Sequence, residues 1–98
     1  MSIIIDRERN EINALRQITK WLGKKVLEIG CGSGRLTRRI AKLGANIEAI
    51  DPNPDLIDVA RQTLPRSFAS RVRFNVGKSS RLEYAPRTFD FVLFSWSL

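Results

Sequence analysis

The stretch Val26-Leu27-Glu28-Ile29-Gly30-Cys31-Gly32-Ser33-Gly34 places three alternating glycines directly after a short apolar run. Glycine has no Cβ, so its backbone adopts positive φ, turns sharply and lets a ligand contact the main chain. The apolar run is long enough for a strand, and helical periodicity begins just after the glycines. This order is typical of a nucleotide site at the carboxyl end of a strand in a parallel sheet.

The acidic residue Asp51 ends the next apolar run and follows Gly30 at about the twenty-residue distance at which a carboxylate accepts hydrogen bonds from both ribose hydroxyls. A dinucleotide fingerprint, G-x-G-x-x-G, would need its third glycine where this chain has Arg35. Here the third glycine is Gly34, which gives the pattern E-x-G-x-G-x-G from Glu28. The spacing therefore departs from that of a dinucleotide site.

This glycine pattern, together with Ala49–Pro54 and the apolar run Phe89–Leu93, resembles the class I S-adenosylmethionine-dependent methyltransferases from about Lys24 onward. The resemblance implies an α/β, Rossmann-like three-layer sandwich with a parallel sheet, helices on both faces and S-adenosylmethionine as cofactor. The family's sheet usually has more strands than the four for which this chain has material. We therefore expect a single truncated domain over residues 1–98, with an N-terminal helical region at 1–23 and the cofactor-binding half at 24–98. Such a chain is a fragment, a truncated reading frame or a half-domain that something else completes.

The resemblance also implies which residues bind the cofactor. Gly30 and Gly32 meet its methionine and ribose portions through their backbone, and Asp51 holds the ribose hydroxyls. Glu28 either orients the loop, reaches the amino group of the donor through water, or pairs with a nearby lysine or a loop N–H. The full expected set is Glu28, Gly30, Cys31, Gly32, Gly34, Asp51, Pro52, Asn53, Ser79 and Ser95.

Two further segments belong to the expected site. Ser95 and Trp96 follow the fourth strand and are expected near the sulfonium, although covering an open core is an equally good interpretation of Trp96. After the third strand the family often carries an acidic residue for the adenine amino group, whereas this chain has Lys78, which only donates. Ser79, a backbone carbonyl or solvent must then meet that amino group, unless Lys78 marks a ligand that carries phosphate.

Cys31 lies in the glycine loop, but the chain has no histidine to activate it, so a small loop filler is the better interpretation. The absence of histidine and the single cysteine also argue against a zinc site, and we expect no metal. One cysteine forms no internal disulfide, which fits a reducing cytoplasm. The opening apolar residues are too few for a signal peptide and no run reaches membrane-spanning length, so we expect a cytoplasmic protein without membrane contact.

Apolar periodicity predicts three helices. The first covers 7–22, with Ile12, Leu15, Ile18 and Leu22 as its apolar stripe; the second covers 35–43 and ends at Gly44. The third covers 55–64, with Asn53 as its cap and Pro54 in its first turn. Its expected buried residues are Leu56, Val59, Ala60 and Leu64.

Four strands are predicted over 25–29, 46–50, 71–76 and 89–93, the third of them alternating apolar and polar residues as an edge strand does. Right-handed crossovers and the resemblance give the strand order 3-2-1-4. The winding then reverses between the first and fourth strands, where open α/β sheets bind ligands. The polar stretch 78–88 is expected to be a surface connection.

The chain has 17 basic and 10 acidic residues and a net charge of +7, which raises the possibility of a nucleic-acid partner. Arg35, Arg38, Arg39 and Lys42 are expected largely on one outward face of the second helix. No aromatic residues are interleaved with them as a base-stacking surface requires, so a solvated face is the commoner interpretation.

The sequence thus predicts methyl transfer from S-adenosylmethionine to an unidentified acceptor, or the donor-binding half of such an enzyme. The alternative is a noncatalytic Rossmann-like binding or partner subunit for S-adenosylmethionine or another nucleotide. No catalytic residue is assigned, because a sulfonium methyl is already electrophilic and needs mainly positioning. The fourth strand is apolar on both faces, so we also expect it to pair with a second copy or a partner chain.

Overall fold

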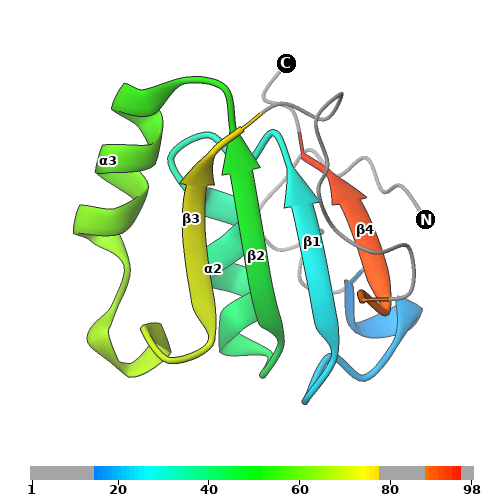
Figure 1. Ribbon diagram of the computed structural model, residues 1–98. Helices are drawn as coiled ribbons and strands as arrows, with labels where there is room; N and C mark the ends of the chain where they lie inside the picture. The colour runs from blue at the N-terminus through cyan, green and yellow to red at the C-terminus, as the bar shows by residue number, and fades with distance from the viewer. Residues whose placement is uncertain (1–14, 78–87, 96–98) are drawn as a thin grey trace.

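The computed structural model describes residues 15–77 and 88–95. The chain forms, in order, β1 (Lys25–Ile29), α2 (Arg35–Lys42), β2 (Asn46–Asp51), α3 (Pro54–Thr63), the 3₁₀ turn η1 (Arg66–Phe68), β3 (Val72–Val76) and β4 (Phe91–Phe94). The strands form one sheet in the order β3-β2-β1-β4 (Figure 1). All neighbouring strands in it are parallel. The predicted α/β class, parallel sheet and strand order are therefore confirmed.

β1 is a central strand, with β2 on one side and β4 on the other. Glu28 is in register with Ala49 of β2 and with Leu93 of β4. The chain passes from β1 to β2 and β3 on one side and then returns to the other side for β4. The winding thus reverses between β1 and β4, as predicted, and the carboxyl ends of β1, β2 and β4 meet at one edge of the sheet.

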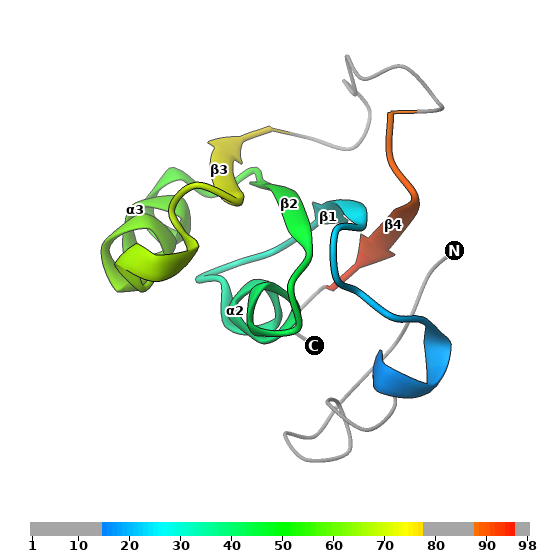
Figure 2. The ribbon, with the colours of Figure 1, turned by 90° about the horizontal axis from the view of Figure 1, so that it is seen from below.

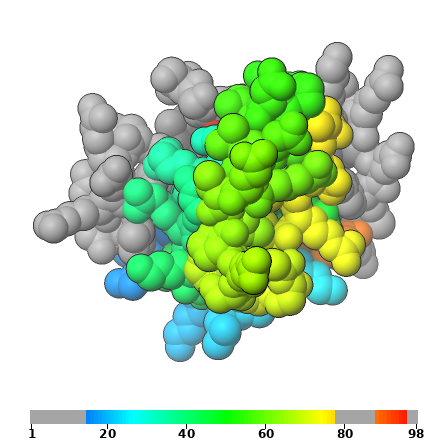
Figure 3. All heavy atoms as spheres, turned by 90° about the vertical axis from the view of Figure 1, so that its left-hand side faces the viewer, coloured from blue at the N-terminus to red at the C-terminus, as the bar shows by residue number. Residues whose placement is uncertain are grey.

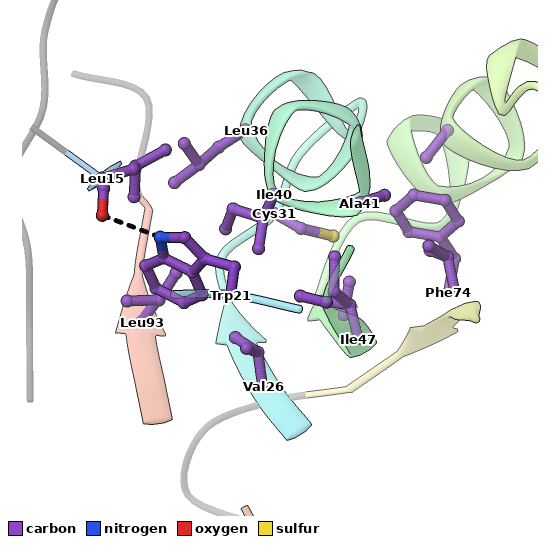
Figure 4. Packing of buried hydrophobic residues seen from close by; sticks show 14 of the residues in the cluster. Leu15, Trp21, Val26, Cys31, Leu36, Ile40, Ala41, Ile47, Phe74 and Leu93 are labelled. Carbon is purple, nitrogen blue, oxygen red and sulfur yellow. Dashed lines mark hydrogen bonds between the residues drawn. The ribbon is translucent and has the colours of Figure 1, made fainter. Parts of the chain in front are cut away.

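The described helices lie on one face of the sheet (Figure 2). Strand residues such as Val26, Ile47 and Leu93 point into this layer and pack against Leu36 and Ile40 of α2 (Figure 4). The opposite face carries a second apolar cluster, formed by Leu27, Ile29 and Ile50 with Phe89, Val92 and Phe94 beside it. Within residues 15–77 and 88–95 no helix covers that face, so only one of the two expected helix layers is described.

The first helix ends earlier than its apolar stripe predicted. Among the described residues it covers 15–18, and Leu22 is 80% exposed instead of buried. Trp21 takes the core position: its indole Nε1 donates to the carbonyl of Leu15 at 2.8 Å (Figure 4). Its ring also packs on that of Phe91. An indole buries more apolar surface than a leucine and needs a partner for its N–H, which explains why Trp21 displaces Leu22.

α3 begins as predicted and buries Ala60 as expected, but Leu56 and Val59 do not take the buried positions predicted for them. The Asn53 side chain accepts hydrogen bonds from two backbone N–H groups of the first turn, at 2.9 and 3.3 Å. The buried residues are Ile57 and Ala60, whereas Leu56 and Val59 are 36% and 43% exposed. Ile57 and Ala60 are three residues apart and share one face of the helix, so their contact with the sheet turns Leu56 and Val59 outward.

The edge strand β3 is covered by α3 on the side of the molecule shown in Figure 3. Arg61 of α3 donates two hydrogen bonds to the carbonyl of Phe74, at 3.2 and 2.7 Å. This guanidinium occupies a backbone acceptor of the edge, which makes the edge a poorer template for another strand. A hollow beside it is lined by Glu48, Arg61, Leu64, Ala69, Val72, Arg73, Phe74 and Asn75.

Gly34 fixes the packing between α2, α3 and β3, and its replacement is expected to destabilise the fold. A Cβ on Gly34 meets the Phe74 ring at 3.0 and 3.2 Å and the Cβ of Ala60 at 3.4 Å. Gly23 has a similar φ, 74° against 88°, but a Cβ there meets nothing within 4 Å. Gly34→Ala should lower the free energy of unfolding by about 1–3 kcal/mol more than Gly23→Ala, since both share the backbone strain and only the first overpacks the core.

Urea unfolding followed by circular dichroism measures both variants against the unchanged chain. Equal losses of stability in Gly34→Ala and Gly23→Ala would show that a Cβ at position 34 costs nothing against Phe74 and Ala60.

Candidate functional site

The glycine loop adopts the backbone that the sequence predicts. Gly30, Gly32 and Gly34 have φ values of 80°, 56° and 88°, all in the left-handed region that favours glycine. The N–H groups of Gly30 and Cys31 both donate to the carbonyl of Ile50, at 2.8 and 3.1 Å. The loop that follows β1 is thereby attached to the end of β2, directly beside Asp51.

Asp51 faces this loop and is buried, with an exposed fraction of 8%. Its Oδ2 accepts from the backbone N–H of Gly32 and its Oδ1 accepts from that of Asn53, both at 2.9 Å. An ionised carboxylate has about four lone-pair positions, so these two bonds orient the group and leave acceptor capacity on it. Asp51 is therefore preset to accept further hydrogen bonds from a ligand at the end of β2.

Gly32 and Gly34 have different surroundings and hence different roles. A Cβ on Gly32 would meet nothing within 4 Å, whereas one on Gly34 would meet Phe74. The space beside Gly32 is open next to the Asp51 carboxylate, so a ligand there can approach the main chain. Gly34 instead serves the packing of the protein.

Glu28 is fully buried and connects three elements. Its Oε1 accepts from the hydroxyl of Thr37 in α2, and its Oε2 accepts from that of Ser95, which follows β4. The backbone N–H of Ser95 donates to the carbonyl of Ile29 at 3.0 Å. The Ser95 hydroxyl also lies within hydrogen-bond distance of the carbonyl oxygen of Gly30, at 3.3 Å. These hydrogen bonds connect Glu28 to α2 and to the end of β4, and the roles that the sequence left open for Glu28 toward the loop or the donor stay predictions.

Thr37 is a site residue that the sequence analysis missed. It is fully buried on α2 between Leu36 and Ile40, which belong to the apolar face of the helix. A polar residue inside such a face needs a buried hydrogen-bond partner, and Glu28 is a buried acceptor. A threonine on the apolar face of the predicted helix was the feature of the sequence that could have indicated this hydrogen bond.

Cys31 takes part through its backbone. Its side chain points into the core toward Ile40 and Ala41 (Figure 4). Burial raises the pKa of the Cys31 thiol, and the nearby carboxylates of Glu28 and Asp51 raise it further. The thiol therefore stays protonated, which agrees with a filler and excludes an activated nucleophile.

The other expected site residues fall into two groups. Pro52 and Asn53 lie exposed at the start of α3, where Asn53 caps the helix and its N–H holds Asp51. Lys78, Ser79 and Trp96 lie outside the described residues. The structure thus brings together Glu28, Gly30, Gly32, Asp51 and Ser95 at the carboxyl ends of β1, β2 and β4.

The arginines of α2 do not all point outward. Arg38 donates to the carbonyl of Ser33 at 2.9 Å and to the hydroxyl of Thr63 at 3.1 Å, so it ties the glycine loop to the end of α3. Arg35 and Lys42 are exposed. Arg39 is half-buried like Arg38, so two of the four expected cations are fully exposed, and a nucleic-acid partner stays a prediction.

Neither a metal cluster nor a membrane span is found in the part of the chain that the structure describes. No group of three or more histidine, cysteine, aspartate or glutamate residues gathers there to hold a metal ion. No described helix is long and apolar enough to cross a membrane.

Two curated proteins that are similar to this chain are named as O-methyltransferases. The chain is 38% identical over 71 residues to the magnesium-protoporphyrin O-methyltransferase of Rhodobacter capsulatus, covering 72% of this chain and 31% of that protein. It is 40% identical over 72 residues to the mitochondrial ubiquinone biosynthesis O-methyltransferase of Schizosaccharomyces pombe, covering 71% of this chain and 26% of that protein. The chain thus spans about a third or less of the length of these relatives.

Solved structures share the fold. A TehB-like SAM-dependent methyltransferase from Corynebacterium glutamicum has a TM-score of 0.68 and 28% identity, over 86% of this chain and 42% of that one. The magnesium protoporphyrin IX methyltransferase of Synechocystis, with bound S-adenosylhomocysteine, has a TM-score of 0.72 and 22% identity, over 85% of this chain and 37% of that one. The family model described as "Methyltransferase domain" matches residues 26–98. With its glycine loop, its strand order and this match over most of its length, the chain belongs to the methyltransferase-domain family.

Proposed function

We propose that this chain is the donor-binding part of an S-adenosylmethionine-dependent methyltransferase. The observation that carries the proposal is the buried carboxylate of Asp51, held by the N–H of Gly32 beside open space at the end of β2. Family membership supports it, as do the O-methyltransferase names of the relatives. Because the chain spans only about a third or less of those relatives, the activity and acceptor of the whole protein go beyond what the comparisons cover.

The described residues fit the cofactor. Asp51 has acceptor positions left for the two ribose hydroxyls, and the open space at Gly32 admits a ligand to the main chain. Ser95, held by the buried carboxylate of Glu28, lies at the neighbouring end of β4. The ribose of the cofactor therefore finds an acceptor and open space at this edge of the sheet.

When bound, S-adenosylmethionine supplies an electrophilic methyl group. The work left to the chain is to hold the donor rigidly, to exclude water and to leave the methyl open to an acceptor. The Cys31 thiol is not suited to nucleophilic catalysis, since it is buried and stays protonated. We therefore expect the residues of this site to bind and position the donor rather than to react with it.

The noncatalytic alternative is a subunit that binds the nucleotide and relies on another chain for chemistry. Where that nucleotide is S-adenosylmethionine, both hypotheses predict donor binding, and turnover with an acceptor separates them. The outer edge of β4 has no strand beside it among the described residues, and a second copy or partner chain pairing there stays part of the proposal. So does a cytoplasmic location, which rests on the single cysteine.

Asp51→Ala is expected to weaken binding of S-adenosylhomocysteine, measured by isothermal titration calorimetry. A hydrogen bond to a charged group contributes roughly 1.5–3 kcal/mol, or about tenfold to a hundredfold in affinity. The matched control is Asp58→Ala, which removes an exposed carboxylate from α3. Equal affinity in Asp51→Ala and the unchanged chain would remove Asp51 from the site.

Gly32→Val is expected to abolish binding of S-adenosylhomocysteine and to leave the helical circular dichroism largely intact. A β-branched side chain disfavours positive φ and fills the open space beside Asp51. Gly23→Val is the control, because Gly23 also has positive φ and open surroundings but lies away from the loop. Binding retained in Gly32→Val, or lost to the same degree in Gly23→Val, would contradict a ligand beside Gly32.

A further inference from the structure

The edge of the sheet at the amino ends of the strands is strongly basic. It lies opposite the candidate donor site and faces the viewer in Figure 2. Four connections form it, at 19–25, 42–46, 64–71 and 88–90. Asp90 is the acidic residue in these connections, and its Oδ2 accepts from the backbone N–H of Lys25 at 2.8 Å. The cations in them are Lys20, Lys24, Lys25, Lys42, Arg66 and Arg71.

The usual reason for cations at such an edge explains only part of this set. A helix that crosses back over a parallel sheet ends at the amino edge, where its last carbonyls favour positive charge. At the end of α2, Arg71 meets this need, because its guanidinium donates to the carbonyls of Ala41 and Ala45 at 2.9 and 2.7 Å. Lys24 and Lys25 lead into β1, so no helix end accounts for them.

Leu22 lies among these cations and is 80% exposed. Its position is fixed, since the residue before it, Trp21, is buried and the N–H of the residue after it, Gly23, donates to the carbonyl of Gly44 at 3.0 Å. A Cβ on Gly44 would meet Leu22 Cδ1 at 2.7 Å, so the leucine lies against the connection that follows Lys42. The fold therefore holds an apolar side chain in solvent between two groups of lysines.

We propose that this amino-terminal edge is a surface that binds an anionic phospholipid bilayer, with Leu22 entering the boundary between headgroups and acyl chains. Lysine ammonium groups attract anionic headgroups, and an exposed leucine gains free energy when it leaves water. A nucleic acid offers phosphates to the lysines but no apolar phase to the leucine. A bilayer accommodates both, so it is the partner that the exposed side chains of this edge fit.

This proposal replaces the sequence-based expectation of no membrane contact, which rested on the absence of a spanning run. Attachment to a bilayer surface needs no span. β1 has five residues, and at about 3.3 Å for each residue the donor site lies roughly 16 Å from the attached edge and faces away from the bilayer. Donor binding and attachment are therefore separate properties of the chain.

The test is flotation of the 98-residue chain with two kinds of vesicle, one of phosphatidylcholine alone and one of equal parts phosphatidylcholine and phosphatidylglycerol. The chain should bind the mixed vesicles, more weakly as salt is raised, and should not bind phosphatidylcholine alone. Leu22→Gln should lower the partition coefficient about tenfold. The double variant Lys20→Gln/Lys25→Gln should lower it about twentyfold, since each lysine near an anionic surface contributes about fivefold.

Matched controls remove similar groups from other surfaces. Arg35→Gln/Arg73→Gln removes the same charge from exposed positions on α2 and β3, and Val59→Gln removes a 43% exposed apolar side chain from α3. Each control should change the partition coefficient by about twofold or less, because charges beyond a Debye length from the bilayer are screened. Every replaced side chain is exposed, so the circular dichroism of all variants should match that of the unchanged chain.

Three results would overturn the proposal: no binding to the mixed vesicles, equal weakening by the control pair of arginines, or vesicle binding that Leu22→Gln leaves unchanged. The second would show a response to net charge alone. Binding of a short DNA duplex without binding to vesicles would assign the edge to nucleic acid instead. None of these results touches the proposed function, which is measured separately by titration with S-adenosylhomocysteine and should be unaffected by Leu22→Gln.

Discussion

The end of β1 is fastened to the end of β2 by hydrogen bonds to the backbone of the glycine loop, and the site depends on this attachment. The N–H groups of Gly30 and Cys31 donate to the carbonyl of Ile50. The N–H of Gly32 donates to the carboxylate of Asp51. These bonds require a chain that turns sharply right after an interior strand, which the positive φ values of the glycines allow. The same contacts that close the turn also aim Asp51, so folding of the loop and preparation of the site are one event.

Two carboxylates lie buried at this edge of the sheet and are satisfied in different ways. Asp51 is bonded by backbone N–H groups and retains acceptor capacity beside open space. Glu28 is bonded by two hydroxyls from α2 and from the end of β4. Leaving a buried carboxylate without partners is costly, so Glu28 holds α2, β1 and β4 in one arrangement at the point where the winding reverses. Its neighbour Cys31 contributes bulk to the core rather than chemistry.

Much of this arrangement was predictable, because it depends on local rules. Alternating glycines after an apolar run predict the loop, Asn53-Pro54 predicts the start of α3, and right-handed crossovers with the family resemblance predict the strand order. The failures came where tertiary packing decides between local options. The helix at 15–18 ends because Trp21 fills the core in place of Leu22, and α3 buries Ile57 rather than Leu56 because of how it meets β3. Thr37 was missed since its partner, Glu28, is nine residues away along the chain and on another element.

The central claim, that the donor binds at the carboxyl ends of β1, β2 and β4, is tested most directly by two-dimensional ¹H–¹⁵N NMR of the chain during titration with S-adenosylhomocysteine. We expect the largest shifts for the backbone amides of Gly32, Asn53 and Ser95 and small ones for those lining the hollow at the β3 edge, such as Arg73 and Asn75. Shifts concentrated at the β3 edge, or none at all in a folded chain, would contradict the account.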